Sequence, residues 1–256
     1  YYHQAIGTTL RVTALFDGVV PLPRAQIKGL GAAQVDALLK QRYVPESPQG
    51  LQTSINAYLV QVDGRRVLVD AGTADCFGPG LGQVAANLKA AGFRPEDVDD
   101  VLLTHAHPDH LCGVLGADGA RAFPSATLWL DDAELAYWEG PEAEPRTPQA
   151  LRFIVGLARR ALAPYQAAGR LRPFRPGDAL PGGIRALASP GHTPGHTSYL
   201  IGAGISACSS GPNGPSTAWA RPPWRASCSS ICARISCQRP LERGAANGCT
   251  WSVDSA

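Results

Sequence analysis

Methionine is absent from the 256-residue sequence, and no apolar run approaches the roughly 20 residues that span a bilayer. The first residues also lack the basic and apolar segments of a signal peptide. These absences argue against a membrane-embedded protein. We expect a soluble chain that has been processed, trimmed or cut from a longer one. Its compartment stays open, because it could be cytoplasmic or exported with a signal already removed.

The chain also has no large excess of positive or negative charge, since its net charge is +2 and no block of like charges occurs. Such a weak field favours neither nucleic acid nor an anionic membrane as a partner. Cysteine is rare before residue 200, where only Cys76 and Cys112 occur, and the other cysteines crowd the C-terminal end. Their spacings match no paired zinc knuckle, so the sequence indicates no disulfide framework.

Short β-rich segments alternate with helical patterns over most of the chain, which predicts a layered α/β fold. Asp63-Gly64 separates two β-rich segments and predicts a hairpin. Strands are expected over residues 8–15, 53–61, 66–70, 101–104, 126–130, 184–188 and 197–201. Helices are expected over residues 32–41, over 83–91, from Asp131 onward, and from the cap Thr147-Pro148 to about 168.

The composition changes after Ile205, where Ser, Pro, Cys, Arg and Trp dominate and acidic residues nearly vanish. This segment shows no period of 2 or 3.6 residues. A disordered tail is one interpretation, although scattered Trp and Cys are unusual for disorder. Translation from a shifted reading frame is the interpretation we favour. We therefore predict one folded domain over residues 1–204 and an aberrant segment over 205–256 that is not native to the fold.

Four metal-ligand side chains, His105, His107, Asp109 and His110, occur within six residues directly after the predicted strand 101–104. Imidazole and carboxylate groups suit zinc and similar divalent ions. The alternation of His105 and His107 places both on one side of an extended segment. A histidine-rich loop that only forms hydrogen bonds is the minor alternative.

A second loop carries His192 and His196 among glycines that let the backbone approach a site closely. A lone loop histidine is most often a solvent-exposed bystander. Here, however, five of the six histidines lie in the two loops, which favours a shared metal site. Asp70 ends a predicted strand, where it is either a turn former or a residue that orients a ligand histidine from behind.

These motifs resemble those of metallo-β-lactamase-fold hydrolases. The HxHxDH motif matches residues 105–110, their next ligand loop resembles residues 191–196, and the similarity covers roughly residues 8–203. Residues 13–18 and 70–79 are similar to the methyl parathion hydrolase group, and quorum-quenching lactonases share the fold. The resemblance implies an α/β fold, an αββα sandwich of two mixed sheets flanked by helices, with the C-terminal part incomplete or irregular.

The resemblance also implies that residues 1–204 form the hydrolase domain, and it assigns roles to individual residues. His105, His107 and His192 would hold a first metal, and Asp109 and His110 a second. Asp70 and His196 would support the ligands without binding the metal. The aromatic residues of the substrate pocket would be Phe77, Trp138 and Phe153. For each aromatic the alternative is ordinary core packing, which we favour for Phe153.

The sequence departs from the family pattern near its end. No histidine follows His196, and Asp254, the only aspartate of the tail, lies in no matching context. The final histidine and the bridging aspartate of the family are therefore missing. We expect weak occupancy of the second metal position and low or absent activity. Missing strands would also expose apolar surface, so a homodimer or low solubility is expected.

The implied chemistry is metal-dependent hydrolysis with one or two Zn²⁺ ions or other divalent ions as the cofactor. A zinc-activated hydroxide, oriented by Asp109, would attack a carbonyl carbon or a phosphorus centre. The expected partner is a small-molecule ester, lactone or phosphotriester. A thioester hydrolase of the glyoxalase II type and an inactive metal-binding remnant remain the alternatives.

Overall fold

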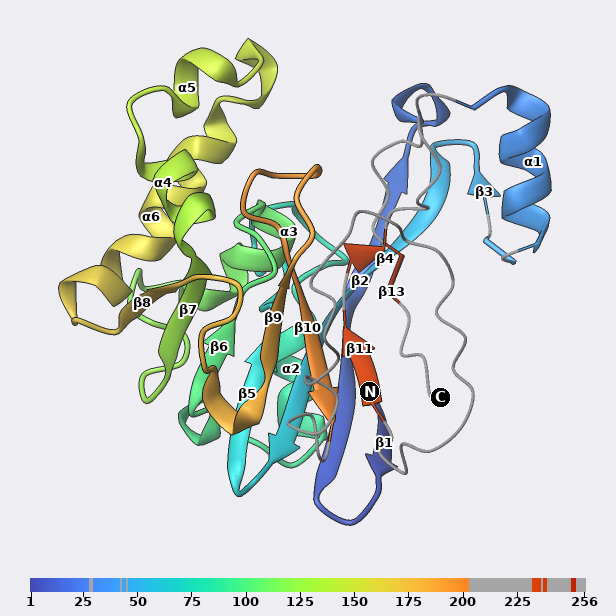
Figure 1. The fold of residues 1–256 in the computed structure, drawn as a ribbon. Helices are drawn as coiled ribbons and strands as arrows, with labels where there is room; N and C mark the ends of the chain where they lie inside the picture. The colour runs from blue at the N-terminus through green and yellow to red at the C-terminus, as the bar shows by residue number, and fades with distance from the viewer. Residues whose placement is uncertain are drawn as a thin grey trace, which may run out of the picture.

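The computed structural model describes residues 1–27, 30–41, 43–44 and 46–202, and the backbone of three short strands beyond them (Figure 1). Those strands are β11 (Cys232–Ile235), β12 (Cys237–Gln238) and β13 (Thr250–Trp251). The rest of the predicted aberrant segment 205–256, including Asp254, lies outside the described residues. The division into a folded domain and an aberrant segment therefore stays a prediction.

One large mixed sheet forms the middle of the fold. Its strands pair in the order β1-β2-β4-β5-β6-β7-β8, with β3 on β4. The pairs are antiparallel as far as β5 and parallel from β5 to β8, so β5, β6 and β7 end at the same edge. The strands are β1 (Tyr2–Ile6), β2 (Leu10–Leu22), β3 (Glu46–Ser47), β4 (Gly50–Val62), β5 (Arg65–Val69), β6 (Asp100–Leu102), β7 (Thr127–Asp131) and β8 (Leu171–Phe174).

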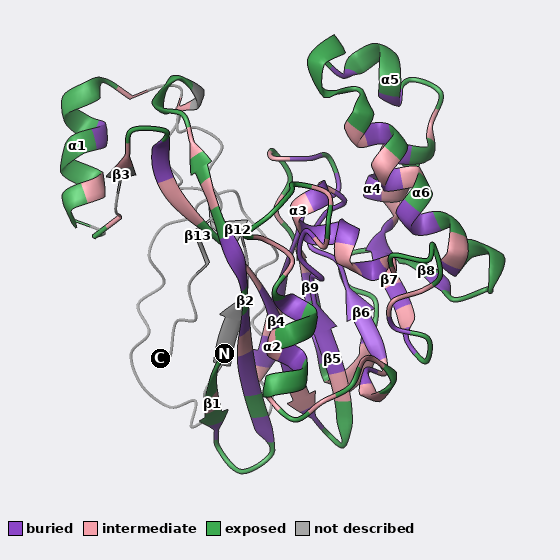
Figure 2. Ribbon diagram, turned by 180° about the vertical axis from the view of Figure 1, so that it is seen from behind, coloured by how far each residue is buried: buried purple, intermediate pink, exposed green. Residues whose placement is uncertain are grey.

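A second, antiparallel sheet contains β9 (Arg185–Ala188), β10 (Thr197–Gly202) and β11. The helices are α1 (Ala32–Gln41), α2 (Val84–Ala90), α3 (Pro108–Leu111), α4 (Asp132–Glu139), α5 (Ala143–Arg146) and α6 (Phe153–Ala167). Figure 2 shows that α1 is largely exposed and stands apart, whereas buried residues concentrate in the central strands. Among the described residues, no helix combines the length and the apolar character needed to cross a membrane.

Alternation along the strands gives each face of the large sheet its own core. Leu59 and Leu68 point to the helical side, where they share a cluster with residues of α2, α3, α4 and α6. Their neighbours Val60 and Val67 point to the other side and pack in a cluster with residues of β9 and β10. This period of two is what a sheet buried on both faces requires. The predicted fold of two sheets flanked by helices is confirmed.

The predicted helix at residues 147–168 begins later than its capping signal indicated. Thr147 does not cap it, because its hydroxyl donates to the Ala143 carbonyl at 2.7 Å and so belongs to the end of α5. A 3₁₀ turn (Gln149–Leu151) follows, and α6 starts at Phe153. Besides the two-residue strand β3, the large sheet contains two strands that were not predicted, β1 and β8. They are edge strands with several exposed residues, so their sequences lack a clean apolar alternation.

A disulfide joins Cys76 to Cys112, 36 residues apart, although the sequence indicated no disulfide framework. The bond ties the loop after β5 to the turn that follows α3. Spacing alone could not reveal it, because only the parallel pairing of β5 with β6 brings the two segments together. The two cysteines before residue 200 therefore form one local crosslink.

Replacing both cysteines by serine is expected to lower the free energy of unfolding by about 4 kcal/mol, from the chain entropy of a loop of this length. Urea unfolding of the oxidised wild type and of Cys76→Ser/Cys112→Ser, both metal-free, measures the difference. Oxidised and reduced wild type provide a second pair with identical side chains. Equal unfolding free energies in both pairs would contradict a formed crosslink.

Candidate metal centre

The two histidine loops meet at the edge where the parallel strands end. β6 ends at Leu102, and α3 begins with Pro108 directly after His107, so the chain between them is a short extended loop. The second loop connects β9 to β10. The Thr197 amide donates to the Thr104 carbonyl at 2.9 Å, and the Tyr199 hydroxyl donates to the Leu103 carbonyl at 2.7 Å. These bonds fix the second sheet against the loop of the first.

Three imidazoles from the two loops converge on one point. His105, His107 and His192 offer ring nitrogens that all lie within 4.8 Å of one another. The His107 Nδ1 atom is 3.1 Å from His105 Nε2 and 2.9 Å from His192 Nε2. Ligand nitrogens of a tetrahedral zinc site are about 3.3 Å apart, given Zn–N bonds of about 2.0–2.1 Å. The donor set and its spacing therefore fit a single zinc-sized cation.

Asp70 and Thr104 determine which nitrogen of His105 is free. The Thr104 hydroxyl lies 3.0 Å from Asp70 Oδ2 and 3.0 Å from His105 Nδ1. A carboxylate only accepts, so the hydroxyl donates its one proton to Asp70 and accepts from Nδ1–H of His105. This tautomer leaves Nε2 of His105 with its lone pair directed at His107 and His192. A supporting carboxylate behind a ligand histidine is common in metal sites.

The sequence assigned Asp70 a supporting position, and the structure places it behind two histidines. It is fully buried at the end of β5, and its φ of +58° is one that aspartate tolerates better than most residues. Oδ2 of Asp70 also lies 2.8 Å from Nδ1 of His110, and Oδ1 accepts the Thr104 amide at 2.8 Å. One carboxylate thus orients both His105 and His110.

The proposed second position consists of Asp109 and His110. Their side chains lie side by side, with 3.2 Å between His110 Nε2 and Asp109 Oδ2. Burial lowers the pKa of His110, but the carboxylates of Asp109 and Asp70 outweigh it and raise that pKa to about 10. Burial raises the pKa of Asp109, yet His110 lowers it further, so this carboxyl stays ionised. Without a metal, the pair is an ion pair with a protonated imidazole.

The pKa values of the three converging histidines are lowered, in contrast to that of His110. Burial lowers the pKa of His107 to about 4, and burial together with His107 lowers the pKa of His192 to about 3. The pKa of His105 also falls well below its usual value, mainly through burial. All three rings are therefore neutral at neutral pH. A neutral imidazole is the form that binds a metal ion.

His196, predicted to support the ligands, lies beside them and is buried. Its Nδ1 is 2.8 Å from the Ser189 hydroxyl, and its carbonyl accepts the Ser189 amide at 2.9 Å. The ring centre is 5.1 Å from that of His105 and 6.0 Å from that of His192. His196 thus closes the base of its loop, next to the three converging rings.

The three predicted pocket aromatics have different surroundings. Trp138 is buried in the helical-side core, and its ring centre lies 5.5 Å from that of His107 in an edge-on contact. Phe77 is 42% exposed on the loop after β5. Phe153 is 55% exposed at the start of α6, so the favoured interpretation of core packing was wrong for it. Of these three aromatic residues, it is Trp138 whose ring contacts a site histidine.

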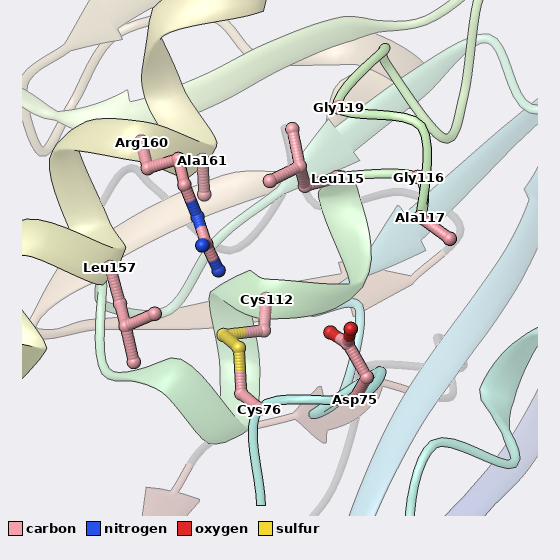
Figure 3. A pocket seen from close by; sticks show the side chains of 10 residues that line it. All are labelled: Asp75, Cys76, Cys112, Leu115, Gly116, Ala117, Gly119, Leu157, Arg160 and Ala161. Atoms are coloured by element: carbon pink, nitrogen blue, oxygen red, sulfur yellow. A yellow bond between two sulfur atoms is a disulfide. The ribbon is translucent and has the colours of Figure 1, made fainter.

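A pocket of about 180 Å³ lies beside the disulfide (Figure 3), where the Arg160 side chain extends toward Cys76 and Cys112. None of its lining residues is a site histidine or one of the predicted pocket aromatics. This hollow is therefore distinct from the metal centre. Its lining residues are Asp75, Cys76, Cys112, Leu115, Gly116, Ala117, Gly119, Leu157, Arg160 and Ala161.

The family model of the metallo-beta-lactamase superfamily matches residues 51–206, which include both histidine loops. The chain belongs to this superfamily. The hydrolase AbOPH, in the beta lactamase superfamily, has a crystal structure that superposes on this chain with a TM-score of 0.72 and 40% sequence identity. The match covers 78% of this chain and 69% of the AbOPH chain. AidC, a dizinc quorum-quenching lactonase, is 24% identical with a TM-score of 0.66 over 78% of this chain and 69% of its own, which shows the shared fold.

Curated relatives are similar to part of the chain. The probable metallo-hydrolase Rv2300c of Mycobacterium tuberculosis is 28% identical over 60% of this chain and 54% of its own length. Ribonuclease TTHA0252 of Thermus thermophilus is 32% identical over 58% of this chain and 32% of its own. The chain spans about half the length of the first of these relatives and less of the second. Family membership therefore identifies the hydrolase fold but not the substrate.

Two residues that hold the site together carried no sequence signal. Thr104 ends the predicted strand 101–104 and lies two residues beyond β6, and Glu134 lies on α4, where a glutamate usually indicates a solvated helix face. Both are fully buried and both bind the histidine loops through hydrogen bonds. A polar residue at the end of a predicted buried strand is the only clue that could have singled out Thr104.

Proposed function

We propose that the chain hydrolyses an ester-like bond, in an organophosphate triester or a lactone, at a zinc ion held by His105, His107 and His192. The observation that carries this proposal is the convergence of three neutral imidazole nitrogens at zinc-ligand spacing. Bound there, zinc would lower the pKa of a coordinated water and polarise the electrophile. Asp109 and His110 would hold a second, weaker ion.

The chain's own residues have distinct roles in this scheme. Asp70 and Thr104 hold His105 in the tautomer that leaves Nε2 free. The Asp109 side chain is 33% exposed, and its ionised carboxylate would orient the attacking water. Trp138 packs edge-on against His107 and limits how far that ring can rotate.

The choice of substrate rests on resemblance. Two sequence stretches, residues 13–18 and 70–79, are similar to the methyl parathion hydrolase group, and AidC is a lactonase of the same fold. In the first stretch, the buried Asp17 accepts the Thr73 amide at 3.0 Å and the Val84 amide at 3.1 Å. It thereby fixes the loop that carries Phe77, so the two stretches act as one structural unit.

A comparative assay tests the proposal. The chain is stripped with a chelator, reloaded with zinc, and offered an aryl phosphotriester, an N-acyl homoserine lactone, an acyl-glutathione thioester and single-stranded RNA. We expect slow turnover of the phosphotriester or the lactone that the chelator removes and zinc restores. Turnover of the thioester or the RNA alone would contradict the proposal. Tight zinc binding without turnover of any substrate would instead support an inactive remnant.

A further inference from the structure

Glu134 connects the two histidine loops through a single carboxylate. Its Oε1 atom accepts the Ala106 amide at 3.1 Å, and its Oε2 atom accepts the Gly195 amide at 2.9 Å. Ala106 lies between His105 and His107, and Gly195 precedes His196 in the other loop. The side chain is fully buried, so these bonds are not exchanged with water. Charge-assisted bonds of this kind are about twice as strong as neutral ones.

The close packing of the second loop on α4 depends on Gly195. A Cβ atom at this position would lie 2.3 Å from the Glu134 amide nitrogen and 2.7 Å from Asp131 Oδ1. Asp131 caps α4 by accepting the Ala133 amide at 2.8 Å, so the first turn of the helix cannot retreat easily. The glycine therefore allows the loop amide to reach the carboxylate. The contact therefore depends on the glycine in the loop as well as on the glutamate in α4.

The same carboxylate also fixes the aromatic wall. Trp138, one helical turn after Glu134, donates its indole N–H to Oε1 at 2.7 Å. Its ring meets His107 edge-on. Three neutral N–H groups thus share one buried carboxylate, and each of them belongs to a segment that contacts or carries a site histidine. None of these bonds uses a nitrogen that would bind the metal.

We infer that Glu134 is a positioning residue of the metal centre, in addition to Asp70 and Thr104. It holds the loop of His105 and His107 and the loop of His192 at the separation at which the three imidazoles share one cation. The inference rests on the proposed metal site and adds a residue that never touches the ion. Because the carboxylate is already engaged in the metal-free fold, the ligands are pre-organised, which reduces the ordering cost of binding.

The substitution Glu134→Gln tests the inference because it leaves the shape of the side chain almost unchanged. One carboxylate oxygen becomes an NH₂ group that faces an N–H donor, so one loop loses its anchor. We expect a 10- to 100-fold weaker zinc affinity, the usual effect of removing a supporting partner. The matched control is Glu139→Gln, at the exposed end of the same helix, which should bind zinc like the wild type. Zinc affinity is measured by competition with a chromophoric chelator.

Two readouts separate positioning from general stability. A merely structural role would lower the melting temperature of the metal-free Glu134→Gln protein but leave the zinc affinity of its folded molecules unchanged, which would overturn the inference. Hydrogen exchange in the metal-free wild type does not depend on any variant folding. We expect slow exchange of the Ala106 and Gly195 amides, and fast exchange of either would also overturn it. A wild type that binds no zinc would instead refute the metal site itself.

Discussion

Replacing His192 by alanine is expected to weaken zinc binding by more than about 100-fold, because even the loss of a partner behind a ligand costs 10- to 100-fold. His192 is the only member of the converging set that comes from the second loop, 85 residues from His107. Without it, His105 and His107 leave a two-ligand site that cannot complete a stable tetrahedron. Zinc-dependent hydrolysis should disappear with the metal.

Elemental analysis after dialysis against dilute chelator measures this effect directly. The wild type should retain one tightly bound zinc per chain, and His192→Ala should retain none. His3→Ala is the matched control, since His3 is exposed on β1 far along the chain from both loops. Retention of zinc by His192→Ala would refute the three-histidine site. Two tightly bound ions in the wild type would show that Asp109 and His110 form a stronger position than proposed.

Asp70→Asn is expected to lower the free energy of unfolding of the metal-free protein by about 3 kcal/mol or more, the usual cost of breaking a buried ion pair on one side. The carboxylate is fully buried and faces the protonated His110 at 2.8 Å. Asparagine keeps the size and tolerates the positive φ, so the change isolates the charge. Asp109 still faces His110 and compensates only in part.

Urea unfolding at neutral pH with a chelator present measures this cost. Asp63→Asn is the matched control, because Asp63 also has a positive φ, of 48°, but is exposed in the hairpin turn. We expect its unfolding free energy to stay close to that of the wild type. If Asp70→Asn were equally harmless, the buried pair with His110 would not stabilise the fold.

The sequence predicted those parts of the site that are local or chemically rare. His105, His107, Asp109 and His110 follow one another directly after a buried strand, so their proximity needs no tertiary information. His192 could be added because histidine is scarce and its loop carries glycines. The central strands and the hairpin at Asp63-Gly64 were predictable for a similar reason, since two apolar, β-rich segments flank a two-residue turn directly along the chain.

The structural features that could not be predicted from the sequence depend on contacts between distant segments. The Cys76–Cys112 bond and the partners of Glu134 exist only because β6 and α4 place them together. Phe153 shows how a local rule fails, since an aromatic residue at a helix start looks like core. The buried face of α6 is made by Val155, Ala158, Ala161, Leu162 and Tyr165. Phe153 lies two positions before that stripe begins and so faces outward.

The three imidazoles come from the edges of both sheets, so a cation bound among them would join the two layers of the sandwich. Such an ion binds the folded chain and has no equivalent site in the unfolded one. Free zinc at 100 times the dissociation constant would then add about 2.7 kcal/mol to folding. The folded fraction of this protein should therefore rise and fall with the zinc supply of its surroundings.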